Sequence, residues 1–248
     1  MAGIFGVLLL LVLTSPVFAQ TGWKWEAQTH EASEEGYKFK WSYPKLLSGP
    51  GDTKNWQRLL DRKVADWANE FQNDFDDNQK ELKKTREQYP DTPSMDWGSE
   101  GSYQVVWQDE RRLVLLWQGY DFRGGAHGAH FLEVSVLDAQ QPDSLLPPSS
   151  LFDDETEVLR TLSAVTRVQL AEQFGQPLDE WALKGTEPKW ENFSIVYPNN
   201  TAGTERFEVI FPSYQVAPYA AGTPTVEIPF EVLAPWTQSL VSESESKS

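Results

Sequence analysis

Aromatic residues alternate with mainly polar residues over positions 23–45, on either side of a Glu-Glu-Gly break at 34–36. A two-residue repeat is typical of strands with one buried face, and a glycine-containing break between two such runs indicates a turn. We therefore predict two strands joined by a turn, followed by a loop over residues 44–53.

The spacing becomes helical from Asn55 to about Tyr89. Apolar residues recur there mostly every three or four positions, at Trp56, Leu59, Leu60, Val64, Trp67, Phe71, Phe75 and Leu82. Such a stripe predicts a long helix that packs on a core. A partner-binding helix would show the same pattern, and we favour the packed helix because core-facing stripes are several times more common.

Residues 102–120 contain two apolar runs separated by Asp-Glu-Arg-Arg, which predicts a second hairpin with Trp107 and Trp117 in the core. A third strand is predicted at 130–137. The loop between these strands holds Gly124, Gly125 and Gly128. Two successive glycines indicate positive φ angles or the close approach of another chain, and their small neighbours leave the imidazoles nearby accessible.

The second half repeats this mixture of strands and one helix. Residues 140–150 are rich in Pro and Ser and predict a linker. A helix is expected between Asp154, as its cap with Glu157 in the capping-box position, and Gly175. Short strands at 193–197, 207–211 and 225–230 are followed by one helical turn at 231–233.

We therefore predict an α+β fold of two small domains, each with antiparallel β-sheet packed by one main α-helix. The N-terminal domain is placed at 22–139 and the C-terminal domain at 151–237, with the linker at 140–150 between them. The polar end, residues 238–248, is expected to be a disordered tail.

The first 20 residues carry no Asp, Glu, Lys or Arg, contain an apolar run, and end in a small-x-small cleavage site. This pattern predicts a secretory signal peptide at 1–19 and a periplasmic or secreted protein. No later run is long and apolar enough to span a bilayer, so no membrane anchor is expected after cleavage. The absence of cysteine excludes disulfides and a thiol nucleophile.

The formal net charge is -16, and none of it comes from the predicted signal peptide. An acidic protein repels nucleic acid and anionic lipids, and at low ionic strength it attracts basic proteins. Nucleic acid is therefore not an expected partner. Simple solubility of an exported protein explains the same charge.

The order of three segments identifies a family resemblance. The first is Tyr43-Pro44 before the long helix, and the second is Gly124-Gly125-Ala126-His127-Gly128. The third runs from Phe211 through the tyrosines at 214 and 219 to the strand ending at Phe230, and Leu151-Phe152 before the second helix also fits. With these segments the chain resembles the paired extracellular domains of the lysozyme-sensing anti-sigma factor RsiV and of the N-terminal region of the peptidoglycan deacetylase PdaC.

The resemblance implies an exported, non-enzymatic cell-envelope binding protein that recognises a basic lysozyme-like hydrolase or peptidoglycan. Because we find no internal transmembrane helix and no additional catalytic domain, we expect neither signalling by proteolysis nor deacetylation. We expect Tyr214, Pro218 and Tyr219 to contact the ligand, since amphipathic aromatics beside a rigid proline suit a shallow surface. The same residues could instead only shape a loop.

His127 and His130, with Asp121 and Glu133 nearby, are the chain's candidates for chemistry. Strand alternation places His130 and Glu133 on opposite faces of a sheet, so we expect no metal site and no cofactor, and we expect His127 to hydrogen-bond the backbone of the glycine loop. The alternative function is an envelope polysaccharide hydrolase or deacetylase that uses His127 or His130 with a carboxylate.

Overall fold

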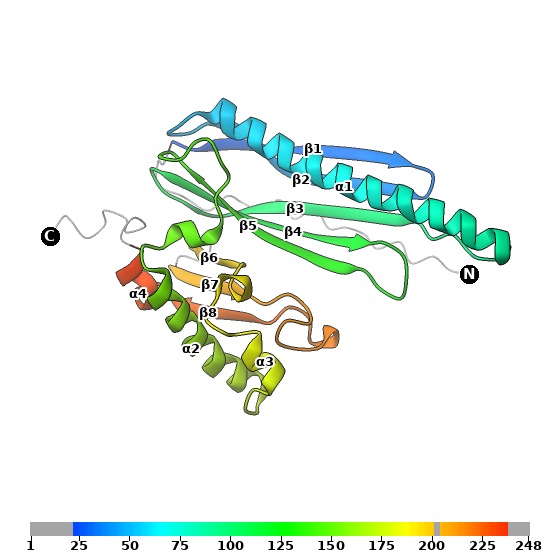
Figure 1. Ribbon diagram of the computed structural model, residues 1–248. Coiled ribbons are helices and arrows are strands. Elements are labelled where there is room, and N and C mark those ends of the chain that lie inside the picture. Colours follow the sequence, from blue (N-terminus) through cyan, green and yellow to red (C-terminus); the bar gives the residue numbers. More distant parts are fainter. Residues whose placement is uncertain (1–21, 201–203, 238–248) are drawn as a thin grey trace.

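The structure is a computed structural model that describes residues 22–200 and 204–237. The predicted signal peptide at 1–19 and the predicted tail at 238–248 lie outside the described residues. The chain forms an α+β fold, as predicted, with a five-stranded and a three-stranded sheet. Figure 1 shows the long helix α1 along one face of the larger sheet, with the smaller sheet and helix α2 on its other side.

The larger sheet contains all strands of the first half in the order β1-β2-β3-β4-β5. Their bounds are Lys24–Glu34 for β1, Tyr37–Ser48 for β2, Trp97–Gln108 for β3, Arg112–Phe122 for β4 and Ala129–Asp138 for β5. These strands confirm the two predicted hairpins and the third strand. The β4–β5 connection is the glycine loop.

One pairing in this sheet differs from the prediction of purely antiparallel strands. Strands β2 and β3 are parallel, whereas the β1–β2, β3–β4 and β4–β5 pairs are antiparallel. The cause is the helix between β2 and β3, because a chain that leaves one end of a strand and crosses over a helix returns in the same direction.

Helix α1 spans Thr53–Gln88 and begins after Asp52, whose carboxylate accepts a hydrogen bond from the Asn55 backbone N–H at 3.0 Å. Its buried residues form one stripe, as predicted: Trp56, Leu60, Val64, Ala68, Phe71 and Phe75. This stripe packs on the α1 face of the larger sheet, where Phe39, Trp41 and Trp117 are buried. The packing confirms a core-facing helix.

The second half builds the smaller sheet in the order β6-β7-β8 and covers it with helices. Its elements are α2 at Glu155–Phe174, α3 at Glu180–Lys184, β6 at Val196–Asn199, β7 at Arg206–Ile210, β8 at Thr225–Pro229 and α4 at Phe230–Leu233. The predicted helical turn at 231–233 corresponds to α4. The prediction missed α3 and placed the first strand about three residues early.

Capping fixes both ends of α2. The Asp154 carboxylate accepts hydrogen bonds from the backbone N–H groups of Thr156 and Glu157 at 3.1 Å each, and Gly175 ends the helix with a φ of 66°. The Glu157 carboxylate pairs with Arg160 at 2.7 Å. The predicted cap is therefore confirmed, while the Glu157 side chain forms an ion pair along the helix.

The two sheets share a core. The face of the larger sheet that points away from α1 contributes Trp107, Leu116 and Val134 to the same apolar cluster as Phe207 of β7. The ring of Trp107 stacks on Phe230 with centroids 5.8 Å apart and 8° between the planes. Trp107 and Trp117 are both buried in strands, as predicted.

Candidate functional site

The glycine loop at the tip of the β4–β5 hairpin has a backbone that other residues could not adopt without strain. Gly124 and Gly125 have φ angles of 85° and 92°, which confirms the predicted positive φ. A Cβ atom on Gly128 would lie 2.2 Å from the Asp121 carbonyl oxygen. The Gly128 N–H also donates to the Tyr120 hydroxyl at 2.7 Å, so the loop closes tightly on the end of β4.

His127 joins this loop to a distant segment. Its Nδ1 lies 3.0 Å from the Gly128 carbonyl oxygen, the backbone contact that the sequence predicted. Its ring stacks on Tyr219 with centroids 4.2 Å apart and planes 22° apart, and the Tyr219 hydroxyl donates to the Gly128 carbonyl at 3.4 Å. Desolvation, reinforced by Tyr120, raises the pKa of Tyr219 above its usual value.

Tyr214 extends this contact toward solvent. Its ring centroid lies 5.8 Å from that of Tyr219, and the side chain is 53% exposed. Its φ of 71° is unusual for a residue with a side chain, and its N–H donates to the Ala217 carbonyl at 3.0 Å. Pro218, exposed, caps the short turn that carries Tyr219. We call His127, Tyr214, Pro218 and Tyr219 the loop platform.

The second histidine of the loop does not join the platform. His130 packs edge-on against Tyr120 at 5.4 Å, whereas Glu133 faces α1 and accepts a hydrogen bond from Lys63. Within residues 22–200 and 204–237, no three metal-ligating side chains gather at one point. In the same residues neither His127 nor His130 hydrogen-bonds a carboxylate or a serine hydroxyl, so the geometry forms no recognisable acid–base pair.

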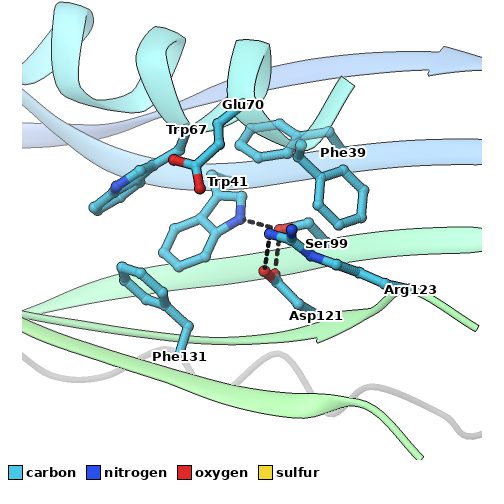
Figure 2. Close-up of a pocket in the computed structure, with 9 residues that line it drawn as sticks. Phe39, Trp41, Trp67, Glu70, Ser99, Asp121, Arg123 and Phe131 are labelled. Atoms are coloured by element: carbon cyan, nitrogen blue, oxygen red, sulfur yellow. Dashed lines mark hydrogen bonds and ion pairs between the residues drawn. The ribbon is translucent and has the colours of Figure 1, made fainter. Parts of the chain in front are cut away.

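A cavity of about 190 Å³ lies between α1 and the larger sheet, behind the same hairpin (Figure 2). We call it the aromatic cavity. It is lined by Phe39, Trp41, Trp67, Glu70, Phe71, Ser99, Asp121, Arg123 and Phe131. Figure 2 shows Glu70 reaching down from the helix, while Asp121 and Arg123 approach from the sheet.

A chain of hydrogen bonds fixes the polar side of this cavity. The Trp41 Nε1–H donates to the Ser99 hydroxyl at 2.8 Å, and that hydroxyl donates to Asp121 Oδ1 at 2.7 Å. Arg123 reaches Asp121 Oδ2 at 3.4 Å and pairs with Asp74 of α1. In the described part of the chain no hydrogen bond or ion pair engages the Glu70 carboxylate.

Two glycines hold the Trp41 ring flat against the sheet. A Cβ atom on Gly101 would come within 2.6 Å of the indole, and one on Gly119 within 2.7 Å. Glycine inside a strand often marks the close approach of another group, and here that group is the Trp41 indole of β2, which reaches across β3 to β4. Trp67 and Phe131 pack against the same indole with centroids 5.0 and 5.1 Å away.

A more open hollow of about 380 Å³ continues the aromatic cavity around the hairpin tip. Both spaces are lined by Asp121, Arg123 and Phe131. The hollow, but not the aromatic cavity, is also lined by His127 and His130. The loop platform and the aromatic cavity therefore lie at one end of the β4–β5 hairpin. Sequence reasoning named the platform residues but did not find the cavity, for which Gly101 and Gly119 were the available signal.

Two family models match the chain on either side of its middle. Residues 30–130 match a family described as "Deacetylase PdaC", and residues 149–231 match "Protein of unknown function (DUF3298)". The first match contains the residues that line the aromatic cavity except Phe131, and the second contains Tyr214, Pro218 and Tyr219. The loop platform thus joins residues from both matched regions.

Individual relatives are distant. The peptidoglycan-N-acetylmuramic acid deacetylase PdaC of Bacillus subtilis is 27% identical over 127 residues, which are 51% of this chain but only 26% of that protein. A DUF3298 family structure from Bacteroides fragilis has a TM-score of 0.57 at 15% identity, covering 87% of this chain and 94% of that one. A DUF3298 family protein from Pseudomonas aeruginosa has a TM-score of 0.49 at 17% identity, covering 86% and 93%.

The Bacteroides structure confirms the fold class of this chain. None of the helices in the described residues is long and apolar enough to cross a membrane. Taken with the two family matches, the order of elements shows that this chain resembles the N-terminal region of PdaC in its first half and paired DUF3298-type domains in its overall organisation.

Proposed function

We propose that this chain is a non-enzymatic cell-envelope protein that binds peptidoglycan through the loop platform. The likeness to a peptidoglycan deacetylase supports a role connected with the envelope. The curated relative extends far beyond the matched segment, so its deacetylase reaction is not part of the proposal. Export of the chain by the signal peptide at 1–19 belongs to the same proposal.

The observation that carries the proposal is the stack of His127 on Tyr219, with centroids 4.2 Å apart. It holds together loops from the two halves of the chain and leaves the neighbouring Tyr214 ring 53% exposed. A fixed, partly exposed aromatic surface loses little conformational freedom when a ligand binds. Rings with a polar hydroxyl suit sugars, whose faces are apolar and whose edges form hydrogen bonds.

The environment of the histidines favours binding over catalysis. The Nδ1 atom of His127 is engaged by the Gly128 carbonyl and one ring face by Tyr219. A general base must reach the proton that it removes, and its partner must orient it. In the described residues the partners of His127 are a backbone carbonyl and an aromatic ring, and neither a carboxylate nor a serine hydroxyl hydrogen-bonds it.

Sedimentation of the purified chain with insoluble peptidoglycan tests this function. We expect Tyr214→Ala to weaken binding by about tenfold, as for an exposed aromatic anchor. Tyr89→Ala is the matched control, because Tyr89 is 60% exposed just beyond α1 and makes no ring contact with either loop in the described structure. Equal binding by the two variants, with unchanged circular dichroism, would show that the platform is not the binding surface.

A basic lysozyme-like hydrolase is the second candidate ligand, and the net charge of -16 favours it. Calorimetric titration with a c-type lysozyme at low and physiological salt separates the two ligands. Binding that persists at physiological salt and is insensitive to Tyr214→Ala would favour the protein ligand. Attraction that disappears with salt would indicate charge pairing alone.

A further inference from the structure

We propose that the aromatic cavity is a binding site for an organic ammonium group, such as a quaternary amine or the end of a lysine-like side chain. The proposal concerns a different place from the loop platform and does not depend on peptidoglycan binding. It rests on the ring surfaces of the cavity, on the balance of its charges and on its size.

The walls of the cavity are aromatic on several sides. Figure 2 shows Trp41 in the middle of the lining, with Trp67 and Phe131 beside it, and the rings of Phe39 and Phe71 also line the cavity. The face of an aromatic ring carries negative potential and attracts a cation within about 6 Å. Several ring faces around one space are the arrangement that recognises quaternary ammonium ligands.

The protein itself shows that these ring faces attract cations. The Arg123 guanidinium lies 5.0 Å from the centre of the Phe71 ring, and the Lys63 ammonium lies 4.8 Å from the centre of the Trp67 ring. Of these two cations, Arg123 lines the aromatic cavity and Lys63 lies outside its lining. An added ammonium would therefore use rings of the same kind that already hold two of the protein's own charges.

The charges around the cavity favour a cation despite these neighbours. Arg123 is matched by Asp74 and Asp121, and Lys63 is matched by Glu133. The remaining carboxylate, Glu70, lines the cavity. An ammonium that enters would thus be attracted by the exposed Glu70 carboxylate beside the rings, through a charge-assisted hydrogen bond.

The size of the cavity limits the ligand to one small group. A cavity of roughly 150 Å³ holds a benzene molecule. The aromatic cavity, at about 190 Å³, therefore accommodates a single branched ammonium group, and the open hollow beside it gives access from the hairpin tip.

Calorimetric titration of the full mature chain with choline tests the proposal. The comparison ligand is 3,3-dimethylbutan-1-ol, which has the shape of choline without its charge. We expect choline to bind saturably and at least about tenfold more tightly than the neutral alcohol, because only the cation gains from the rings and the carboxylate. Butylammonium, titrated in parallel, distinguishes a primary amine of the lysine type from a quaternary one.

Two variants of the lining residues should act in opposite directions. Glu70→Gln removes the attracting charge with little change of shape and should weaken choline binding by about tenfold. Arg123→Gln removes a competing cation and should strengthen binding several-fold. Glu87→Gln, an exposed glutamate near the end of the same helix, is the control for net charge and should leave the affinity unchanged.

Several results would overturn the proposal. No saturable binding of either amine by the unmodified chain would exclude the site. Equal affinity for choline and the neutral alcohol would show that the cavity binds apolar groups and does not recognise the positive charge. Weakening by both Glu70→Gln and Arg123→Gln, together with binding of N-acetylglucosamine, would identify a neutral sugar site instead. Loss of choline binding in Tyr214→Ala, with Glu70→Gln unaffected, would move the site to the loop platform.

Discussion

The fit of Trp41 against the glycines of the sheet leads to a quantitative prediction for Gly101→Ala. The added Cβ would meet three atoms of the Trp41 indole, Cη2, Cζ2 and Cζ3, at 2.6 Å each. Carbon atoms in contact normally lie about 3.5 to 4.0 Å apart. The indole cannot retreat easily, because it is 2% exposed, hydrogen-bonded to Ser99 and packed by Trp67.

The magnitude follows from a matched substitution in the same strand. An alanine Cβ at Gly98 would find its nearest neighbour, the Lys38 carbonyl oxygen, at 4.0 Å. Both substitutions restrict the unfolded chain, which stabilises the folded state by about 0.4–1 kcal/mol. Only Gly101→Ala also overpacks the core, at a cost of about 1–3 kcal/mol. For a chain of this size the Tm of Gly101→Ala should lie about 2–12 °C below that of Gly98→Ala.

Thermal unfolding followed by circular dichroism measures this difference. Trp41→Phe should relieve part of the penalty, because the smaller ring leaves room for the methyl group, and a double-mutant cycle should give a coupling of at least about 0.5 kcal/mol. Equal Tm values for Gly98→Ala and Gly101→Ala would refute the reasoning, since they would mean that the indole is free to move.

Three further predictions concern stability. Burial opposes ionisation of Asp138, but hydrogen bonds from Arg111 and from the Gln140 N–H hold the pKa of its carboxyl below the usual value. The ionised carboxylate therefore stabilises the fold above about pH 4, and this stabilisation is lost as the pH falls through the lower pKa of the folded state. The urea midpoint should fall over that range, and less steeply in Asp138→Asn. That substitution should itself cost about 3 kcal/mol, because it removes a carboxylate that pairs with the buried Arg112. Asp154→Ala should lower the free energy of unfolding by about 1 kcal/mol in urea titrations, through loss of the α2 cap. Trp107→Ala should cost about 3–5 kcal/mol and lower the urea midpoints of both halves together, as followed by fluorescence and circular dichroism.

Local patterns in the sequence were sufficient for most of the fold. The apolar stripe of α1, the alternation in β1 and β2, and the cap at Asp154 each depend on neighbours within a few residues, and each was predicted. Helix α3 was missed because five residues are too few to display a helical period. The parallel β2–β3 pair was missed because it joins strands on either side of α1, and tertiary packing decides which strands become neighbours across such a crossover.

The candidate site was only partly predictable for the same reason. The sequence indicated the positive φ angles at Gly124 and Gly125 and the backbone contact of His127, which are local. It could not show that His127 stacks on Tyr219, because that contact needs both sheets in place. The aromatic cavity combines side chains from α1 with side chains from strands β2 to β5, so no single stretch of sequence carries its pattern.

The shared core between the sheets limits how this chain can be divided. Residues of β3, β4 and β5 bury one face of the smaller sheet, and Trp107 lies directly on Phe230. A fragment cut between residues 130 and 149 would leave each piece with an uncovered apolar face, which favours aggregation. Either half transplanted into another protein would therefore need a replacement partner surface, so the two halves are expected to be inherited and exchanged as one piece.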